Sequence, residues 1–480
     1  MLLHDVLRDA AHRAPDTPAV ITSAATVTFS ELLARVDARA AQIAARTGPG
    51  DRVAVLAENC VEYVELYYAV PHAGRVLVPL NHRLHPTEWT RTIARAGGRV
   101  LYASPAFADR VEHGAAELVE LGGTPNAAFT APDRADGDVA WLIGTSGTTG
   151  DPKLAMLTDA SLVAAVDATL GARPVGPADA LLTPFPLCHV AGYNVLVLHR
   201  RARPIVLQPT FDAPGLARLV RDHAVTLLSL APTMIAMLLD HPDVDDADLA
   251  TVRALGYGAS PIPGPVLRRV VERWDWDCSQ GFGMTELSGN AIFLGPDEHR
   301  AAAAGDSRLL VAAGTPAPGV EVRLGERDEL LVRAPQVMRG YWDDPDATAT
   351  AVDPDGWLHT GDVARIDPDG VVTIVDRTKD IIVSGGENVA SREVEEVLHA
   401  HPEVRDVAVV GIPDERWGEV ITAVVVTRGP VAADDLIAHC RAQLAGFKTP
   451  RRIEFADELP RTASGKVLKH RLREQLSAVG

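Results

Sequence analysis

Residues 145–153 combine hydroxyl, glycine and lysine residues in one short stretch. The stretch reads TSGTTGDPK and directly follows the apolar run 139–143. Hydroxyl and backbone N–H groups can donate to phosphate oxygens, the glycines let the backbone approach closely, and Lys153 adds a positive charge. The stretch lacks the Gly-x4-Gly-Lys-Ser/Thr spacing of a Walker A loop. It therefore predicts a phosphate-binding loop of another kind, with a polar linker as the alternative.

Three later segments place an acidic or basic residue beside glycines. They are GFGMTE at 281–286, HTGD at 359–362 and PRTASGK at 460–466. Taken singly, Glu286 fits a helix cap, Asp362 a turn and Lys466 a solvated surface lysine. GFGMTE also falls short of GxGxxG, so a dinucleotide site gains little support. The case for chemistry rests on the ordered set.

The elements that must position these residues are short apolar runs alternating with amphipathic stretches. The expected strands are 53–57, 76–80, 100–103, 180–183, 204–207 and 227–230, and the expected helices are 62–73 and 86–96. Strands that alternate with helices predict βαβ units and parallel sheets. The phosphate loop would then follow a strand of such a sheet.

The pattern changes in the last third of the chain. Between 314 and 374, alternating runs separated by Gly, Pro and Asp predict antiparallel strands such as 320–324 and 329–333. The expected elements after 376 are helices 393–399 and 434–444 and strands 406–411 and 421–426. We therefore expect an α/β protein with two domains. A large N-terminal domain, residues 1–376, holds parallel α/β subdomains and a small β-barrel-like subdomain, and a small mobile α+β domain, residues 377–480, follows.

Composition excludes several classes of protein. The 480 residues carry 46 Lys and Arg against 64 Asp and Glu, a net charge of −18. A whole-chain nucleic-acid binder is excluded by that charge, and an anion site must be built from local groups. Four scattered cysteines without a CxxC pair argue against disulfides or a zinc cluster. The most apolar segment, 224–239, is too short for a membrane span of ~20 residues. A cytoplasmic protein, monomer or homodimer, is expected.

The ordered motifs resemble those of the adenylate-forming superfamily, which includes acyl-CoA synthetases, nonribosomal-peptide adenylation domains and luciferases. Residues 145–153 match its (S/T)SGTTGxPK loop, and 281–286 are similar to its YGxTE. The segment 359–362 resembles its (R/H)TGD, and 460–466 its P-(R/K)-T-x-x-GK. DRTKD at 376–380 with SGGEN at 384–388 resembles its hinge and glycine loop. The five motifs stand in the family's order over most of the chain.

The resemblance implies an acid–thiol ligase that uses ATP, Mg²⁺ and CoA. A carboxylic acid becomes an acyl-adenylate, and the acyl group then passes to the CoA thiol. Lys466 would bridge the carboxylate and the α-phosphate, Thr285 would contact the α-phosphate, and Glu286 would hold Mg²⁺. Asp362 would bind the ribose hydroxyls, with Arg377 on the other side of the ribose. The remaining expected nucleotide-binding residues are Thr145, Ser146, Gly147, Thr148, Thr149, Gly150, Lys153, Gly258, Ala259, Ser260, Gly281, Phe282, Gly283 and Met284.

The resemblance also implies a rotation of the C-terminal domain about Lys379. The rotation would withdraw Lys466 and bring up the residues that line the thiol's path, Ser384, Gly385, Gly386 and Glu387. His189 would be catalytic, stacking on the acyl group or gating the thiol, with a buried structural histidine as the alternative. The expected acyl pocket is His189, Tyr193, Tyr257 and Asn290, beside Phe282 and Met284. None of these is a cation, which favours an aromatic or medium-length aliphatic acid over a dicarboxylate.

Some features depart from the family pattern and some alternatives stay open. Leu154 stands where glycine is usual, and Phe282 replaces the commoner Tyr. The sequence leaves open whether Arg200 and Arg201 face the pocket. A carrier-protein thiol or a nitrogen nucleophile could replace CoA as the acceptor. A catalytically inactive nucleotide-binding homologue is the alternative from another class, and the intact set of motif residues argues against it.

Overall fold

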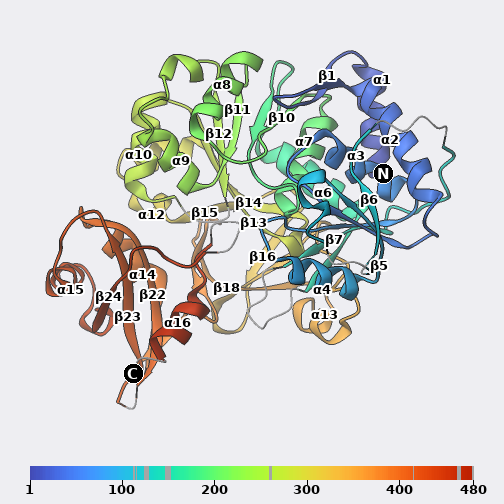
Figure 1. Ribbon diagram of the computed structural model, residues 1–480. Helices are drawn as coiled ribbons and strands as arrows, with labels where there is room; N and C mark the ends of the chain where they lie inside the picture. Colours follow the sequence, from blue (N-terminus) through green and yellow to red (C-terminus); the bar gives the residue numbers. More distant parts are fainter. Residues whose placement is uncertain are drawn as a thin grey trace.

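The computed structural model describes residues 1–111, 114, 116–123, 129–145, 153–258, 262–414, 416–461 and 466–477. Its N-terminal part contains two large sheets with helices, and a smaller α+β unit follows. The smaller unit lies at the lower left of Figure 1, away from the N-terminal helices at the upper right. The expected fold class is confirmed.

The larger sheet joins strands from the whole N-terminal part. Its strands are β1 (Pro18–Ile21), β2 (Thr26–Thr28), β9 (Leu181–Thr183), β10 (Ile205–Leu207), β11 (Leu227–Leu230), β12 (Ala254–Gly258), β13 (Asp277–Met284), β14 (Gly289–Leu294), β15 (Ala312–Pro316), β16 (Glu321–Leu324), β17 (Glu329–Arg333), β18 (Leu358–Ile366) and β19 (Val372–Arg377). Their order is β16-β17-β18-β19-β15-β14-β13-β12-β11-β9-β10-β1-β2. Strands β10-β9-β11-β12-β13 pair in parallel, as the sequence predicted. The antiparallel strands β15–β19 continue the same sheet.

A second sheet carries the predicted phosphate loop. Its strands are β3 (Arg52–Leu56), β4 (Val76–Pro79), β5 (Gly98–Ala103), β6 (Glu117–Glu120), β7 (Val139–Gly144) and β8 (Leu154–Thr158), in the order β6-β5-β3-β4-β7-β8. Strands β7 and β8 form an antiparallel hairpin whose last pair is Gly144 with Leu154. The predicted loop therefore lies between two strands of a hairpin. The other neighbouring strands of this sheet pair in parallel.

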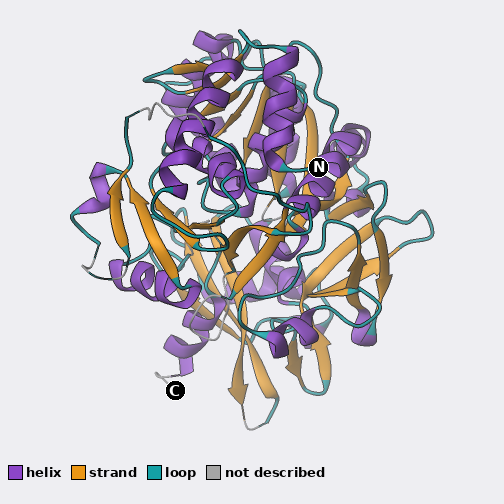
Figure 2. Cartoon of the chain, turned by 90° about the vertical axis from the view of Figure 1, so that its right-hand side faces the viewer, coloured by secondary structure: helices purple, strands orange, loops and turns teal. Residues whose placement is uncertain are grey.

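Helices join the two sheets into one core. They are α1 (Leu3–Arg13), α2 (Phe29–Ala44), α3 (Val61–His72), α4 (Pro86–Ala96), α5 (Pro105–Ala108), α6 (Asp159–Ala172), α7 (Asn194–Arg200), α8 (Ala213–His223), α9 (Pro232–Asp240), α10 (Gly264–Trp274), α11 (Pro296–Ala303), α12 (Ser307–Leu310) and α13 (Pro345–Ala351). Short 3₁₀ turns are η1 (Val190–Tyr193), η2 (Asp246–Leu249), η3 (Thr285–Leu287) and η4 (Glu326–Asp328). One buried cluster joins Tyr67 of α3, Leu162 of α6 and Leu196 of α7 with Trp141 of β7 and Ile205 of β10. Figure 2 shows helices gathered over the strands in the upper part of the molecule.

The C-terminal unit has a small sheet and its own core. Its elements are β20 (Ile382–Ser384), β21 (Glu387–Val389), α14 (Ser391–His399), β22 (Val404–Asp414), β23 (Gly418–Thr427), α15 (Ala433–Arg441), η5 (Gly446–Lys448), β24 (Arg452–Phe455) and α16 (Lys469–Ser477). Val394, Leu398, Val409, Val425 and Leu436 are fully buried together, which explains the apolar spacing of α14 and the alternation of the strands. The expected helices and strands of this unit are all present, with longer strands than expected.

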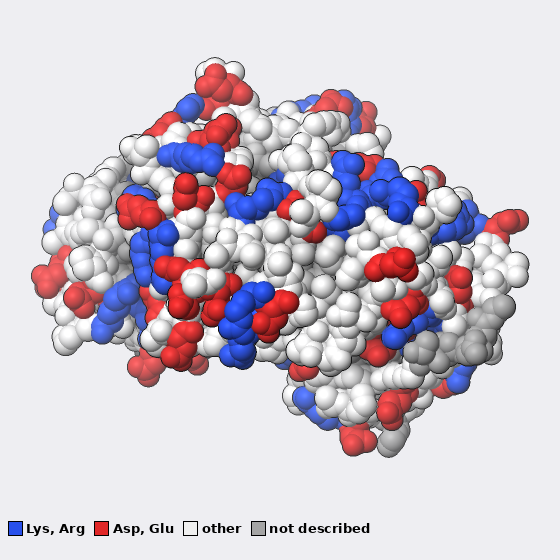
Figure 3. Space-filling view, turned by 90° about the horizontal axis from the view of Figure 1, so that it is seen from above, with Lys and Arg blue, Asp and Glu red and all other residues white. Residues whose placement is uncertain are grey.

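The surface charges, the helices and the cysteines can be compared with the expectations from composition. Lys and Arg side chains are interspersed with Asp and Glu on the face shown in Figure 3, so no basic field covers that face. Among the described residues, no helix has both the length and the apolar character that a membrane crossing requires. All four cysteines are free.

Candidate active site

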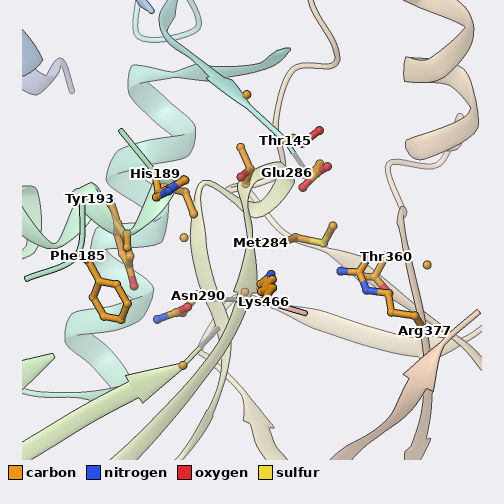
Figure 4. Close-up of a pocket in the computed structure, with 18 of the residues that line it drawn as sticks. Thr145, Phe185, His189, Tyr193, Met284, Glu286, Asn290, Thr360, Arg377 and Lys466 are labelled. Atoms are coloured by element: carbon orange, nitrogen blue, oxygen red, sulfur yellow. The ribbon is translucent and has the colours of Figure 1, made fainter. Parts of the chain in front are cut away.

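A cavity of about 990 Å³ brings most of the predicted residues together. Thr145, Lys153, Glu286 and Arg377 line it together with Lys466 from the C-terminal unit. Figure 4 shows Phe185, His189 and Tyr193 on one side of the cavity, Thr360 and Arg377 on the other, and Lys466 between them. The cavity therefore has two ends, with the predicted acyl residues at one and the predicted ribose residues at the other.

The two ends of the predicted phosphate loop lie close together at the cavity. The backbone N–H of Thr145 donates to the carbonyl of Lys153 at 2.8 Å, which closes the loop at its base. Lys153 Nζ lies 4.9 Å from the centre of the Tyr341 ring. Residues 146–152, which include the predicted Ser146, Gly147, Thr148, Thr149 and Gly150, lie outside the described residues. The described ends of the segment, Thr145 and Lys153, both line the cavity.

Glu286 lies in the turn η3 and faces the same space. The Tyr341 hydroxyl donates to Glu286 Oε1 at 2.7 Å. Burial, and then Glu286 itself, raise the pKa of Tyr341, so the hydroxyl stays protonated and remains a donor. One carboxylate beside a phosphate site suits Mg²⁺, which is usually held by one or two carboxylates together with substrate phosphates. The residues present therefore fit the metal that the resemblance implies.

Asp362 and Arg377 are directly paired. They are opposite each other on the neighbouring strands β18 and β19, and Arg377 Nε lies 2.6 Å from Asp362 Oδ1. The strand register places the two side chains next to each other, and the expectation that they hold a ribose from two sides stays a prediction. Burial raises the pKa of Asp362, while Arg377 and Lys466 oppose that shift. Thr360, Gly361 and Arg377 line the cavity, whereas Asp362 lies just behind them.

Glu329 fixes the turn that precedes Asp362. Its carboxylate accepts hydrogen bonds from Gly361 N–H and from His359 Nδ1, both at 2.9 Å. Gly361 has φ +69°, a left-handed conformation that favours glycine. The glycine of the HTGD segment is thus required by the backbone.

Lys466 enters the cavity from the C-terminal unit. The residue is exposed and lines the cavity. Burial and then the Arg377 charge lower the pKa of Lys466, while Asp362 and Glu286 oppose the shift. The C-terminal unit is therefore held in the orientation that brings Lys466 beside the acidic residues of the N-terminal part.

The predicted hinge and glycine loop lie on the C-terminal side. Lys379 lies between β19 and β20 and lines the cavity. Gly385 and Gly386 have φ +63° and +87°, and a Cβ at Gly385 would lie 3.2 Å from the Trp417 ring. None of Ser384, Gly385, Gly386 and Glu387 lines the cavity. In this orientation the predicted thiol-path residues lie away from the site.

The predicted acyl residues lie together at the other end. His189, Tyr193, Tyr257, Met284 and Asn290 line the cavity, whereas Phe282 packs partly buried beside the core of β14–β18. His189 Nε2 is buried without a hydrogen-bond partner. Burial and the charges of Arg83 and Lys466 lower the pKa of His189 to about 4, so the ring is neutral at pH 7.

Glycines bring neighbouring strands beside the cavity, β12, β13 and β14, close together. Gly258 and Gly281 are paired on β12 and β13, and a Cβ on Gly258 would lie 2.7 Å from the Gly281 carbonyl oxygen. A Cβ on Gly283 would likewise meet the backbone of Gly289. Ala259 and Ser260, predicted next to Gly258, lie outside the described residues. The small residues of these segments are thus required by backbone packing.

Sequence reasoning missed several residues of the cavity, among them Arg83, Arg173 and Tyr341. They stand in no motif, and no local spacing marks them. Arg200 pairs with Asp167 at 3.3 Å, and neither Arg200 nor Arg201 is among the lining residues. The cations of the pocket therefore come from elements other than the nearby arginine run.

The sequence also matches family models and known proteins. The model of the AMP-binding enzyme matches residues 7–342, and that of the AMP-binding enzyme C-terminal domain matches residues 393–466. Feruloyl-CoA synthase of an Amycolatopsis species is 38% identical over 483 aligned residues, which cover 97% of each chain. The fatty acid–acyl-carrier-protein ligase ScoC of Streptomyces coeruleorubidus is 35% identical, covering 97% of this chain and 94% of ScoC.

A solved structure has the same fold over almost the whole chain. It is the o-succinylbenzoate CoA synthetase MenE of Bacillus subtilis, in complex with the acyl-adenylate intermediate OSB-AMP. The TM-score is 0.87 at 30% identity, and the match covers 98% of this chain and 97% of MenE. The family models cover most of the sequence, and the cavity holds the residues of the motifs. This chain belongs to the AMP-binding enzyme family.

Proposed function

We propose that the protein is an ATP-dependent acid–CoA ligase that forms an acyl-adenylate and then an acyl-CoA thioester. The observation that carries this proposal is the meeting of Lys466 with Thr145, Lys153 and Glu286 in one cavity. Lys466 comes from a different unit of the chain and is exposed within the cavity. Cations that converge in this way stabilise negative charge on a bound phosphate.

In the first half-reaction a carboxylate oxygen of the acid attacks the α-phosphorus of ATP. A P–O bond forms, the bond to the β-phosphate oxygen breaks, and pyrophosphate leaves. Charge gathers on the α-phosphate oxygens, so fixed cations and donors lower the barrier. We assign this role to Lys466 and Thr285. Mg²⁺, when bound, neutralises phosphate charge, and Glu286 would hold it.

The opposite end of the cavity suits the nucleoside. Asp362, held by Arg377, can accept hydrogen bonds from ribose hydroxyls, because an ionised carboxylate has several acceptor sites. We assign the base to the part of the cavity wall that Gly258 of β12 forms. Support for these roles comes from the place of Thr360, Gly361 and Arg377 on the cavity wall.

In the second half-reaction the CoA sulfur attacks the acyl carbon and AMP leaves. The C-terminal unit would turn about Lys379, withdraw Lys466 and bring Gly385 and Gly386 to the thiol. The left-handed glycines leave backbone exposed to a narrow pantetheine arm. Neutral His189 would then line the thiol's entry without adding charge.

A carrier-protein thiol is one alternative acceptor. ScoC, named as a ligase to an acyl-carrier protein, is similar over nearly the whole chain, so a carrier-protein thiol is the second candidate. The free cysteines favour a reducing compartment, and we place the enzyme in the cytoplasm. We leave both monomer and homodimer open as its working state.

The test is pyrophosphate release with a panel of carboxylic acids, followed by addition of CoA or of holo-carrier protein. The proposal expects acid-dependent pyrophosphate release and a CoA thioester. Release without a CoA thioester, but with an acylated carrier, would establish the alternative. No acid-dependent release with any acid would refute adenylation itself.

A further inference from the structure

We propose that Arg173 forms a subsite, where the acyl pocket meets a second cavity, for an oxygen acceptor at the far end of the substrate acid. The proposal rests on the acid-activating function proposed above and deepens it, because it names a class of acid. It replaces the expectation of a wholly apolar acid with that of an acid carrying a second oxygen function.

Arg173 stands at the boundary of two cavities. It directly follows α6, and its side chain lines both the main cavity and a second one of about 160 Å³. The two cavities share only Arg173, Asn194 and Ser229 among the residues that line them. All three side chains can form hydrogen bonds. The acyl pocket therefore ends in a polar group of residues.

The charge of Arg173 has no anionic partner in the described part of the chain. Its Nε is buried without a hydrogen-bond partner, and its Cζ lies 5.6 Å from the centre of the Phe293 ring. Asp277, the carboxylate on the wall of the second cavity, is already paired with Arg300. The residue as a whole is half-buried, and a ligand oxygen would supply the acceptor that its buried Nε lacks.

The position of Arg173 is fixed by its neighbours. Its backbone N–H donates to the carbonyl of Thr169 at 2.7 Å, and the Thr169 hydroxyl lies 3.0 Å from the Tyr193 hydroxyl. Gly256 of β12 makes room for the guanidinium, since a Cβ there would overlap Arg173 Nη1. A glycine at 256 thus leaves space for the side chain of Arg173. The C-terminal end of α6 contacts the acyl-pocket residue Tyr193 through Thr169.

Two glycines of β12 face the two cavities. Gly258 lines the main cavity, and Gly256, about 7 Å away along the strand, lines the second one. Acids with a second oxygen several bonds away from the carboxylate are the class that we expect to reach Arg173. Para-oxygenated benzoates and medium-length dicarboxylates have this form. Arg can bind either a carboxylate, in bidentate fashion, or a neutral oxygen.

The test measures kcat/KM for matched acids with wild type, Arg173→Met and Arg173→Lys. The pairs are 4-hydroxybenzoate against 4-methylbenzoate, and adipate against hexanoate. We expect Arg173→Met to lower kcat/KM for the oxygen-bearing acid by about 10- to 100-fold, as for a lost hydrogen bond to a charged group. The kcat/KM for the methyl-ended acids should be unchanged or higher. Arg173→Lys should restore part of the preference, and the two pairs separate a neutral from a charged oxygen.

Two controls keep the outcomes distinct. Arg201→Met removes an exposed arginine at the end of α7 and should leave both preferences unchanged. ATP binding, measured by calorimetry, should be the same in all variants, which shows that Arg173→Met folds. An equal change for both members of each pair, or no change, would overturn the subsite alone. Failure of the wild type to activate any acid would overturn the proposed function together with it.

Discussion

Asp376 and Ser391 are joined across the predicted hinge. Asp376 Oδ2 accepts one hydrogen bond from the backbone N–H of Ser391 and one from its hydroxyl, both at 2.6 Å. Ser391 is the first residue of α14, so the carboxylate also faces the positive end of that helix. Asp376 precedes Lys379 and Ser391 follows it. A rotation about Lys379 would therefore change this contact, and the contact favours the orientation with Lys466 in the cavity.

The first prediction concerns this contact. Ser391→Ala removes the hydroxyl and keeps the N–H, so it should lower the rate of adenylate formation by up to about tenfold, the lower range for a hydrogen bond to a charged group. Transfer of a supplied acyl-adenylate to CoA should be unchanged or faster. Acid-dependent ATP–pyrophosphate exchange and single-turnover thioester formation measure the two steps. Ser477→Ala, on an exposed residue of α16, is the control. An equal loss in both steps would show that Ser391 only stabilises the fold.

The second prediction separates the two half-reactions at Lys466. Lys466→Ala should reduce adenylate formation by orders of magnitude, because the α-phosphate loses the cation that enters the cavity from the C-terminal unit. Thioester formation from a supplied adenylate should stay nearly intact. Both rates can be followed with the same two assays. If both steps fell by the same factor, the division of roles between two orientations would be wrong.

The third prediction concerns nucleotide affinity. Asp362→Ala should weaken ATP binding by roughly 1.5–3 kcal/mol, the usual size for hydrogen bonds to a charged group. Asp362→Asn keeps the shape beside Arg377 and should weaken binding less. Calorimetric titration with ATP gives both values. Asp369→Ala, on a highly exposed turn after the same strand, should change nothing. Unchanged affinity in Asp362→Ala would remove Asp362 from the ribose site.

The fourth prediction is a pH dependence of stability. His199 is fully buried, donates from Nε2 to the carbonyl of Ala19, and accepts from the Tyr68 hydroxyl at Nδ1. Burial lowers the pKa of His199 to about 4. The unfolded chain, with an ordinary histidine pKa near 6.5, takes up the proton first, so stability falls as pH drops from about 6.5 toward 4.

The size of that effect can be measured by difference. Between pH 7 and pH 5, His199 should account for about 2 kcal/mol of the lost free energy of unfolding. When the pH falls from 7 to 5, the free energy of unfolding of His199→Gln should therefore fall by about 2 kcal/mol less than that of wild type. Denaturant titrations at the two pH values measure both changes. His12→Gln, at an exposed histidine, should follow wild type. Identical pH slopes for wild type and His199→Gln would show that His199 can be protonated in the folded protein.

The sequence predicted the fold class and most of the site because both depend on local patterns. Apolar runs marked the parallel strands, and the motifs marked Glu286, Asp362 and Lys466 without any knowledge of their contacts. Pairings between distant elements could not be predicted from these local patterns. The register of β18 with β19 places Arg377 beside Asp362, and Tyr341 reaches Glu286 from a turn with no motif.

Arg173 shows the same limit most clearly. An arginine after a helix normally looks like a solvated residue that interacts with the helix end. Its place at the end of the acyl pocket depends on Gly256, a glycine more than eighty residues later on another element. Only the structure shows that the missing side chain of Gly256 makes room for a guanidinium.

The most direct test of the account is a crystal structure with a non-hydrolysable acyl-adenylate mimic. The account predicts the phosphate-mimicking group between Thr145 and Lys466, the ribose beside Asp362, and the acyl chain directed past His189 toward Arg173. Electron density for the mimic outside this cavity, or a bound mimic with Lys466 remote from it while adenylation proceeds in solution, would contradict the account.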